Sequence, residues 1–286
     1  MARLGGTHRI AGRTVHRMGY GAMQLAGPGA FGPPRDRDEA VAVLREAISL
    51  GIDHIDTSDY YGPYTVNRLI REALDPYPAN LLLVTKLGAR RNAAGEWLRW
   101  NAPDELEHGL RDNMWRLGIE AVEVANLRLM FGHVGPAEGD IRPLLEPLIA
   151  CREKGILKHI GISNALPSQV AEARKMTEIA CVQNAYNLAN RGDDALIDEL
   201  AAAGIPYVPF FPLGGFNPLQ SAKLDRVAAE LGATPMQVAL AWLLQRSPNI
   251  LLIPGTSSLA HLRENIAAAE LELPADAVAE LDKIGG

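Results

Sequence analysis

Brief apolar runs alternate with longer segments of helical periodicity along the whole chain. Apolar runs bounded by turn-forming residues are typical of buried strands. On this criterion we predict eight strands, at residues 17–23, 52–56, 81–86, 122–128, 159–163, 180–184, 207–211 and 250–254.

The segments between these runs carry apolar residues at helical spacing. Val41, Leu44 and Ile48 share one face of a segment that begins near Asp36 and stops at a glycine. Asp36 and Glu39 have the spacing of a capping box, and a glycine after the last apolar position is typical of a helix end. Further stripes or start signals occur at Leu106, Leu110, Met114 and Leu117, at Leu196, Leu200 and Ala203, and at Thr234, Pro235 and Gln237.

Strands that alternate with helices indicate parallel strand–helix–strand units. Eight such units without a break in composition predict an α/β protein with a closed (β/α)8 barrel, the TIM-barrel fold, as a single domain over residues 1–286. The alternative is a doubly wound open sheet, but no GxGxxG turn leads from the first strand into a helix. The residues before position 17 are predicted to form an N-terminal β-hairpin that plugs the barrel floor.

Composition and charge narrow the class of protein. The net charge of −6 does not favour a nucleic-acid partner. No apolar run approaches the length of a membrane span, and the first residues lack the apolar core of a signal peptide. Cys151 and Cys181 are expected to be buried thiols rather than a disulfide or a metal site. We therefore expect a cytoplasmic protein without a metal, and no motif specifies its oligomeric state beyond a monomer or weak dimer.

Polar side chains stand at the ends of several predicted strands, where a barrel carries its chemistry. The second strand ends at Asp56, with Tyr61 just beyond it, and the next two strands end at Lys86 and Arg128. Each has an ordinary structural explanation, as a helix cap, a packed ring or an ion-pair member. Because parallel strands end at the same rim, however, these side chains are predicted to converge on one mouth. The following strands end in Ser163, Asn164, Gln183, Asn184, Phe210 and Phe211.

An Asp, a Tyr and a Lys at one site suggest a specific chemistry. A phenol has a pKa of about 10 and holds its proton too tightly for exchange at neutral pH. A neighbouring ammonium is expected to lower the pKa of Tyr61, and a carboxylate would keep that ammonium charged and oriented. Tyr61 could then donate a proton to a carbonyl oxygen that gains negative charge. Because no side chain supplies a hydride, this interpretation requires a nicotinamide cofactor.

Several stretches in the correct order resemble the aldo-keto reductase family. They are "GIDHIDTSDYYG", "LLLVTK", "KHIGISN", "VQNAYNL", "VPFFPLGG" and "IPGTSSLAHLREN". The resemblance covers the chain from the N-terminal hairpin to the C-terminal helices. It implies reduction of an aldehyde with NADP(H), with Asp56, Tyr61 and Lys86 as catalytic residues and Arg128 in the fourth catalytic place. The cofactor-binding residues that it implies are Gly21, Met23, Ser163, Asn164, Gln183, Phe210, Phe211, Pro212, Leu213, Gly255, Thr256, Ser257, Ser258, His261, Glu264 and Asn265.

The sequence departs from the family pattern at two positions. Arg128 stands where the family usually has a His, and a guanidinium can only donate hydrogen bonds and positive charge. His261 stands where many members have an Arg that holds the 2′-phosphate of NADP. Here Ser257, Ser258 and His261 would bind the 2′-phosphate together, so NADP is expected as the cofactor in preference to NAD.

Over its full length the chain looks most like the bacterial branch of the family that reduces pyridoxal to pyridoxine. The stretches "DTSDYYGP", "KLGARR" and "NLRLM" carry this likeness. Pyridoxal has a phenolate beside its aldehyde, and Arg128 could pair with that phenolate while Tyr61 protonates the carbonyl oxygen. A flat aromatic substrate favours aromatic walls. The substrate-binding candidates are Phe31, Trp97, Trp100 and Met130, taken as loop residues.

Three other functions remain open from the residues. The first is a general aldehyde or ketone reductase for which pyridoxal is incidental. The second is a Schiff-base barrel with Lys86 as the nucleophile, which borohydride trapping would reveal. The third is a cofactor-binding regulatory protein with slow turnover, which ordinary turnover with NADPH would dismiss.

Overall fold

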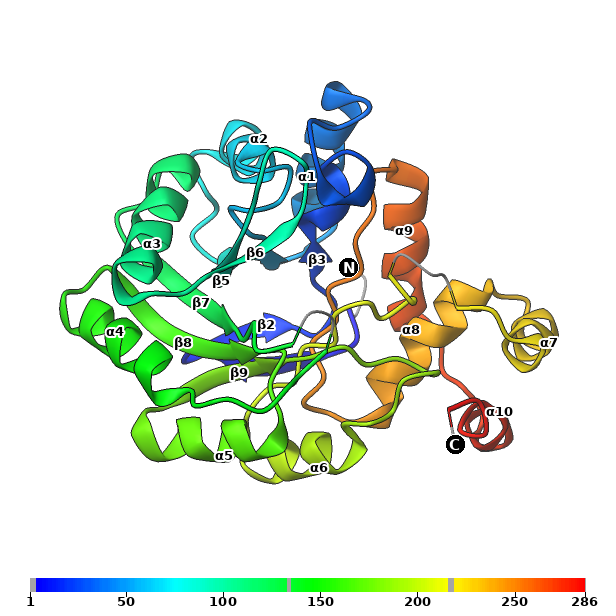
Figure 1. Cartoon of the computed structure of the whole chain (residues 1–286). Coiled ribbons are helices and arrows are strands. Elements are labelled where there is room, and N and C mark those ends of the chain that lie inside the picture. Colours follow the sequence, from blue (N-terminus) through cyan, green and yellow to red (C-terminus); the bar gives the residue numbers. More distant parts are fainter. Residues whose placement is uncertain (1–3, 133–134, 216–218, 286) are drawn as a thin grey trace.

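A curled parallel sheet surrounded by helices forms the molecule (Figure 1), in a computed structural model that describes residues 4–132, 135–215 and 219–285. Six strands pair in the order β3-β4-β5-β7-β8-β9, and every pair is parallel. Their bounds are β3 (Tyr20–Gly21), β4 (His54–Asp56), β5 (Leu82–Arg91), β7 (Val122–Arg128), β8 (Leu157–Ser163) and β9 (Ile179–Gln183).

Two extended segments close the ring between β9 and the N-terminal side of β3. Parallel bridges join Val182 to Tyr207, Tyr207 to Ile250, and Met18 to Leu252. The segments predicted as the seventh and eighth strands are therefore in place, but only as single bridges. Prolines at positions 206, 209, 212 and 254 explain this difference, because proline has no N–H to donate to a ladder.

Helices cover the outside of the ring and follow its strands in order (Figure 1). The capping box predicted at Thr234 and Gln237 is present, whereas at Asp36 only the side chain accepts, from the Glu39 N–H, and the reciprocal bond of the predicted box is not formed. The helices are α1 (Arg37–Ser49), α2 (Thr65–Leu74), α3 (Pro103–Leu117), α4 (Arg142–Glu153), α5 (Pro167–Met176), α6 (Asp194–Ala202), α7 (Ala222–Leu231), α8 (Pro235–Arg246), α9 (Leu259–Ala267) and α10 (Ala275–Leu281), with 3-10 turns η1 (Ala22–Leu25), η2 (Pro28–Ala30) and η3 (Ala268–Glu270).

An antiparallel hairpin of β1 (Thr7–Ile10) and β2 (Arg13–His16) precedes the ring. Ile10 and Val15 from this hairpin belong to one buried apolar cluster with inward residues of the ring, including Leu82, Val124 and Leu251. The hairpin thus fills the amino-terminal end of the barrel, which leaves the opposite end for a cavity. Cys151 and Cys181 are both buried and free, as expected.

A further strand, β6 (Trp97–Trp100), was not predicted. It pairs antiparallel with the last residues of β5, which runs to Arg91 and therefore extends past the predicted end at Lys86. Trp97 and Trp100 consequently lie on a strand and not in a loop. The signal was weak because this short hairpin stands outside the barrel, where no buried face imposes an apolar pattern.

Two properties of the described residues concern membranes and metal ions. No single described helix is long and apolar enough to cross a membrane. Among the described helices, only α7 and α8 taken together reach the length and apolar composition of a membrane span, and they are bent by 92° relative to each other. Within residues 4–132, 135–215 and 219–285, no cluster of His, Cys, Asp and Glu side chains has a geometry suited to a metal ion.

Candidate active site

A cavity of about 310 Å³ opens at the carboxyl ends of the strands. Acidic, basic and phenolic groups share it with an otherwise apolar lining, which is the usual make-up of a small-molecule site. Its lining residues are Gly21, Met23, Gln24, Asp56, Tyr60, Tyr61, Lys86, Trp97, Arg128, Met130, Phe210, Phe211, Pro212, Leu213, Gly215, Ile253, Pro254 and Gly255. All four predicted catalytic residues are among them.

A buried ion pair lies at the base of this cavity. The Lys86 ammonium donates a hydrogen bond to the Asp56 carboxylate and a second one of 3.0 Å to the Thr57 carbonyl. Both charged side chains are only 5% exposed. The other Asp56 oxygen accepts from the Gln183 amide at 2.9 Å. These contacts fix the position of the lysine, because a buried charge is stable only with a partner.

Tyr61 lies beside this ion pair. The Lys86 ammonium is 5.0 Å from the centre of the Tyr61 ring. An ammonium so close is expected to lower the pKa of Tyr61, but the pKa of Tyr61 is raised above its usual value. Burial of the phenol is the largest cause, and the Asp56 charge adds to it, while Arg128 acts in the opposite direction. Tyr61 is therefore a firmly protonated phenol in this state of the molecule.

Arg128 brings a second positive charge into the cavity. It is the last residue of β7, and its guanidinium lies 5.3 Å from the centre of the Phe210 ring. None of the ion pairs found within the described residues includes Arg128. Its charge is thus open to an anionic group in the cavity.

The predicted substrate residues divide into two groups. Trp97 and Met130 line the cavity. Phe31 lies outside the lining, under the Arg91 guanidinium at 5.3 Å, and Trp100 packs toward α3, with its ring 5.9 Å from that of His108. Phe31 and Trp100 are therefore not part of this lining, and their assignment as substrate residues stays a prediction. For Trp100 the reason is the pairing with β5, which places it opposite Gly88 and away from the mouth.

Three of the predicted cofactor residues are buried behind the cavity wall. Ser163 and Gln183 stand opposite each other in the β8–β9 pair. Within the described part of the chain, Ser163 Oγ and Gln183 Oε1 are buried and have no hydrogen-bond partner. Because buried polar groups are nearly always satisfied, these two neighbouring atoms are suited to bonding a polar group of a ligand. Asn164 instead uses its side-chain amide to donate to the Leu129 carbonyl at 2.9 Å.

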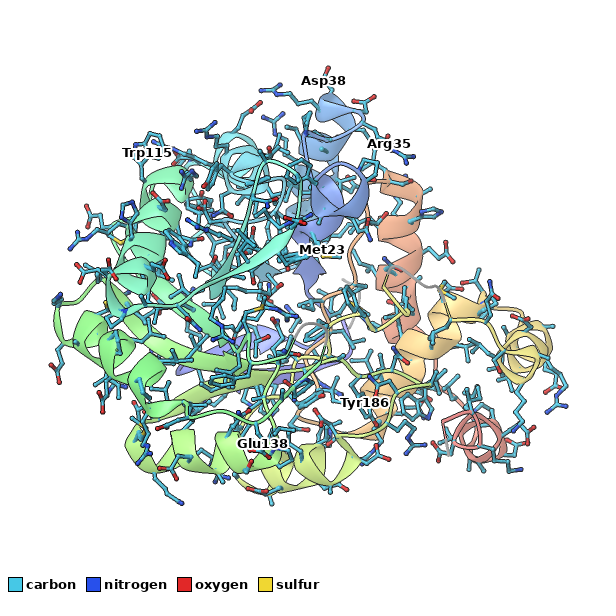
Figure 2. All side chains as sticks on the ribbon, viewed as in Figure 1. Met23, Arg35, Asp38, Trp115, Glu138 and Tyr186 are labelled. Atoms are coloured by element: carbon cyan, nitrogen blue, oxygen red, sulfur yellow. The ribbon has the colours of Figure 1, made fainter. Side chains whose placement is uncertain are left out.

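A second group of predicted cofactor residues forms one side of the cavity itself. This group comprises Gly21, Met23, Phe210, Phe211, Pro212, Leu213 and Gly255. Figure 2 shows Met23 toward the interior of the ring of helices, whereas Trp115 lies on the outer rim. A Cβ atom on Gly21 would come within 2.4 Å of the Ile253 carbonyl oxygen, so this position has no room for a side chain.

The remaining predicted cofactor residues lie in the loop before α9 and along that helix, outside the lining of the cavity. The Thr256 carbonyl accepts from the Tyr20 hydroxyl at 2.6 Å, and its side chain accepts from the Ser258 N–H at 3.0 Å. Glu264 is held by the Thr234 hydroxyl at 2.5 Å. The start of a helix favours anions because its N–H groups are free there. Ser257 and His261 are exposed at this end and Asn265 is buried.

Sequence reasoning missed five lining residues: Gln24, Tyr60, Gly215, Ile253 and Pro254. The prediction placed Tyr61 in the site but not Tyr60. The chain turns tightly here, and both rings face the cavity with their centres 5.5 Å apart. The rule that strand ends carry the site would have found Ile253 and Pro254. No simple signal marks Gln24 or Gly215.

The barrel and its cavity place the chain in a known class of protein. The sequence profile of the aldo/keto reductase family matches residues 17–285. The chain belongs to the aldo/keto reductase family, which confirms the resemblance found in its sequence. Pyridoxine 4-dehydrogenase of Escherichia coli is 61% identical to it over 279 residues, which cover 97% of this chain and 98% of that protein.

Solved structures agree with the barrel fold. A thermostable aldo-keto reductase in complex with the inhibitor epalrestat has a TM-score of 0.81 at 27% identity, over 98% of this chain and 99% of that one. An aldo/keto reductase from Klebsiella pneumoniae in complex with NADP and acetate has a TM-score of 0.79 at 23% identity, over 98% and 95% of the two chains. These likenesses support the (β/α)8 barrel.

Proposed function

We propose that the chain reduces pyridoxal to pyridoxine with NADPH. The observation that carries this proposal is the buried Asp56–Lys86 ion pair beside Tyr61 at the base of the cavity. The 61% identity to pyridoxine 4-dehydrogenase of E. coli supports the substrate. In the direction of reduction, the aldehyde carbon gains a hydride and its oxygen gains a proton, which gives the alcohol.

The residues present fit a bound NADP(H). When bound, the cofactor supplies the hydride from its nicotinamide ring. The unsatisfied Ser163 Oγ and Gln183 Oε1 would receive the carboxamide of that ring. Phe210 offers an aromatic face for stacking, and the start of α9 would hold the phosphate on the adenosine side.

Tyr61 would supply the proton to the carbonyl oxygen. Its raised pKa keeps the phenol protonated before the reaction, as a general acid must be. The Lys86 ammonium and the Arg128 guanidinium then stabilise the negative charge left on Tyr61 when the proton moves. Asp56 holds Lys86 in position through their ion pair.

Arg128 would select the substrate. Its guanidinium lacks an ion-pair partner among the described residues, and pyridoxal carries a phenolate next to the aldehyde. A charge-assisted hydrogen bond between them would place the carbonyl toward Tyr61. Arg128→His should therefore lower kcat/KM for pyridoxal more than for nitrobenzaldehyde. Retained pyridoxal turnover, with no relative gain for nitrobenzaldehyde, would dismiss this role.

The Schiff-base alternative has less support. A lysine nucleophile must lose its proton, whereas Lys86 is buried against the Asp56 carboxylate and donates to it. Removal of a proton from this pair would leave an unpaired buried carboxylate, which is costly.

The test follows NADPH absorbance with pyridoxal and with nitrobenzaldehyde, in the wild type, Tyr61→Phe and Tyr60→Phe. Loss of a general acid lowers the rate by about 10²–10⁴-fold, and we expect this loss in Tyr61→Phe. A larger loss in Tyr60→Phe would move the acid role to the neighbouring ring. If the protein reduces nitrobenzaldehyde but not pyridoxal, the proposed mechanism stands and pyridoxal is rejected as the substrate. Tight NADPH binding without turnover of either aldehyde would favour the regulatory alternative.

A further inference from the structure

Arg91 lies between the hairpin loop at Gly95 and the turn at Gly29 and Ala30. It is the last residue of β5 and lies directly opposite Trp97 of β6. Trp97 and Tyr60 are two rings of the cavity lining that touch edge to face at 5.3 Å, and together they are called here the aromatic wall. We propose that Arg91 positions the aromatic wall and thereby sets the preference of this site for flat aromatic aldehydes. The inference deepens the proposed aldehyde reduction and rests on it.

The Arg91 guanidinium has a specific partner on every side. Its Nε donates to the Gly95 carbonyl at 2.9 Å, and its two terminal nitrogens donate to the Ala30 and Gly29 carbonyls at 3.2 Å each. Its face lies 4.2 Å from the centre of the Trp97 ring. Only the planar fork of an arginine can donate in three directions and stack at the same time.

These contacts reach the backbone next to the proposed acid. The Ala30 carbonyl that accepts from Arg91 also accepts from the Gly62 N–H at 3.0 Å. Gly62 directly follows Tyr61. On the other side, the Trp97 ring touches Tyr60, which touches Tyr61 at 5.5 Å. Arg91 therefore supports the aromatic wall from two sides, through the turn at Ala30 and through the Trp97 ring.

The loop that Arg91 holds needs such support. Gly29 and Ala30 both have positive φ, of 68° and 56°. A non-glycine residue in this region persists only where its surroundings hold it there. Trp97 is also 38% exposed, so the barrel buries only part of its ring. Without Arg91, both the loop and the Trp97 ring lose the partner that orders them.

The expected consequence is selective. A flat aromatic aldehyde must lie against the aromatic wall, whereas a small aliphatic aldehyde such as propanal can reach Tyr61 without touching it. Arg91 is thus a positioning residue for substrate binding and does not itself take part in proton transfer. Its loss should raise KM for the aromatic substrate and leave kcat nearly as it was.

The test compares Arg91→Met and Arg91→Lys with Arg90→Met as the matched control. Arg90 is exposed and lies opposite Leu98, on the other face of the hairpin. Arg91→Met should raise KM for pyridoxal by about tenfold to hundredfold, while its kcat and the kcat/KM for propanal change little. Arg91→Lys keeps the charge but loses the planar fork, so its KM for pyridoxal should lie between those of the wild type and Arg91→Met. Arg90→Met should stay within about twofold of the wild type.

Two kinetic results would overturn the inference: an unchanged KM for pyridoxal, or an equal loss of kcat/KM for pyridoxal and propanal. If the wild type reduces nitrobenzaldehyde but ignores pyridoxal, the proposed substrate fails. Nitrobenzaldehyde then replaces pyridoxal as the flat aldehyde in the comparison with propanal. The same two kinetic results, obtained with nitrobenzaldehyde, would overturn the positioning role of Arg91.

A readout without turnover separates the two proposals. Trp97 emission is isolated as the difference between each protein and the same protein with Trp97→Phe. Arg91→Met should shift this emission to longer wavelength, because the ring gains solvent, and Arg90→Met should not. If the wild type turns over no aldehyde, the proposed function fails, and an unshifted Trp97 emission would then overturn the positioning role as well.

Discussion

Lys86→Met tests whether the ion pair at the cavity base stabilises the folded protein as strongly as its burial indicates. Methionine has a length similar to that of lysine but no charge. The substitution leaves the Asp56 carboxylate with the Gln183 amide as its remaining partner, and it also removes the bond to the Thr57 carbonyl. We expect a large loss of folding free energy together with the loss of activity.

The magnitude follows from the exposure of the two charges. Both side chains are 5% exposed, so the carboxylate left behind cannot recover its hydration. Breaking a buried pair in this way costs about 3–5 kcal/mol. The pair Lys158–Glu123 offers a matched control, with a contact of 2.8 Å but exposures of 55% and 24%. Lys158→Met should cost no more than about 1 kcal/mol.

The assay is equilibrium unfolding in urea, followed by far-UV circular dichroism, for the wild type and each variant. Asp56→Asn and the double variant complete a cycle that isolates the interaction between Asp56 and Lys86. The double variant should be more stable than Lys86→Met, because it carries no unpaired buried charge. If Lys86→Met costs no more than Lys158→Met, or if the cycle shows no coupling, the reasoning about the ion pair is refuted.

Three further predictions concern single residues. Because the pKa of Tyr61 is raised, Tyr61 stays protonated across neutral pH, and kcat/KM for nitrobenzaldehyde reduction should be constant between about pH 6 and pH 9. A fall of kcat/KM with a midpoint near pH 7.5 would contradict the assignment of Tyr61 as the general acid. Gly88→Ala should lower stability by well over about 1 kcal/mol in urea unfolding, since φ is 98° and the new Cβ would lie 2.4 Å from the Arg128 carbonyl oxygen. Gly155→Ala, with φ of 76° and open space, is its control and should cost less. His261→Arg should tighten NADPH about tenfold by pairing with the 2′-phosphate, as measured by fluorescence titration, and unchanged affinity would place that phosphate elsewhere.

Much of the site could be predicted from the order of residues along the chain. Asp56, Lys86 and Arg128 each end an apolar run, and parallel strands of a barrel end at one rim. Local signals therefore suffice to bring these groups together, because the strand–helix rhythm specifies the barrel. The same holds for the helix that Thr234 caps, where the cap and its partner lie three residues apart.

Residues off the strand ends could not be placed in this way. Trp97 and Trp100 belong to one short strand, yet only the first lines the cavity, since its pairing with Arg91 places it there. The positions predicted as strands at 207–211 and 250–254 join the ring through single bridges, because the surrounding prolines remove donors. Pairing and side-chain direction depend on neighbours distant in the sequence.

The barrel, the family and the set of charged groups at its mouth follow from the order of residues along the chain, because alternation, caps and strand ends are local properties. The protonation of Tyr61 and the partners of the buried polar groups, in contrast, depend on the folded molecule. Burial raises the pKa of Tyr61 although an ammonium lies close to it, and two polar atoms behind the wall, on Ser163 and Gln183, lack a partner within the described residues. Desolvation and hydrogen-bond satisfaction are set by everything that surrounds a group, and that environment exists only once distant segments have come together.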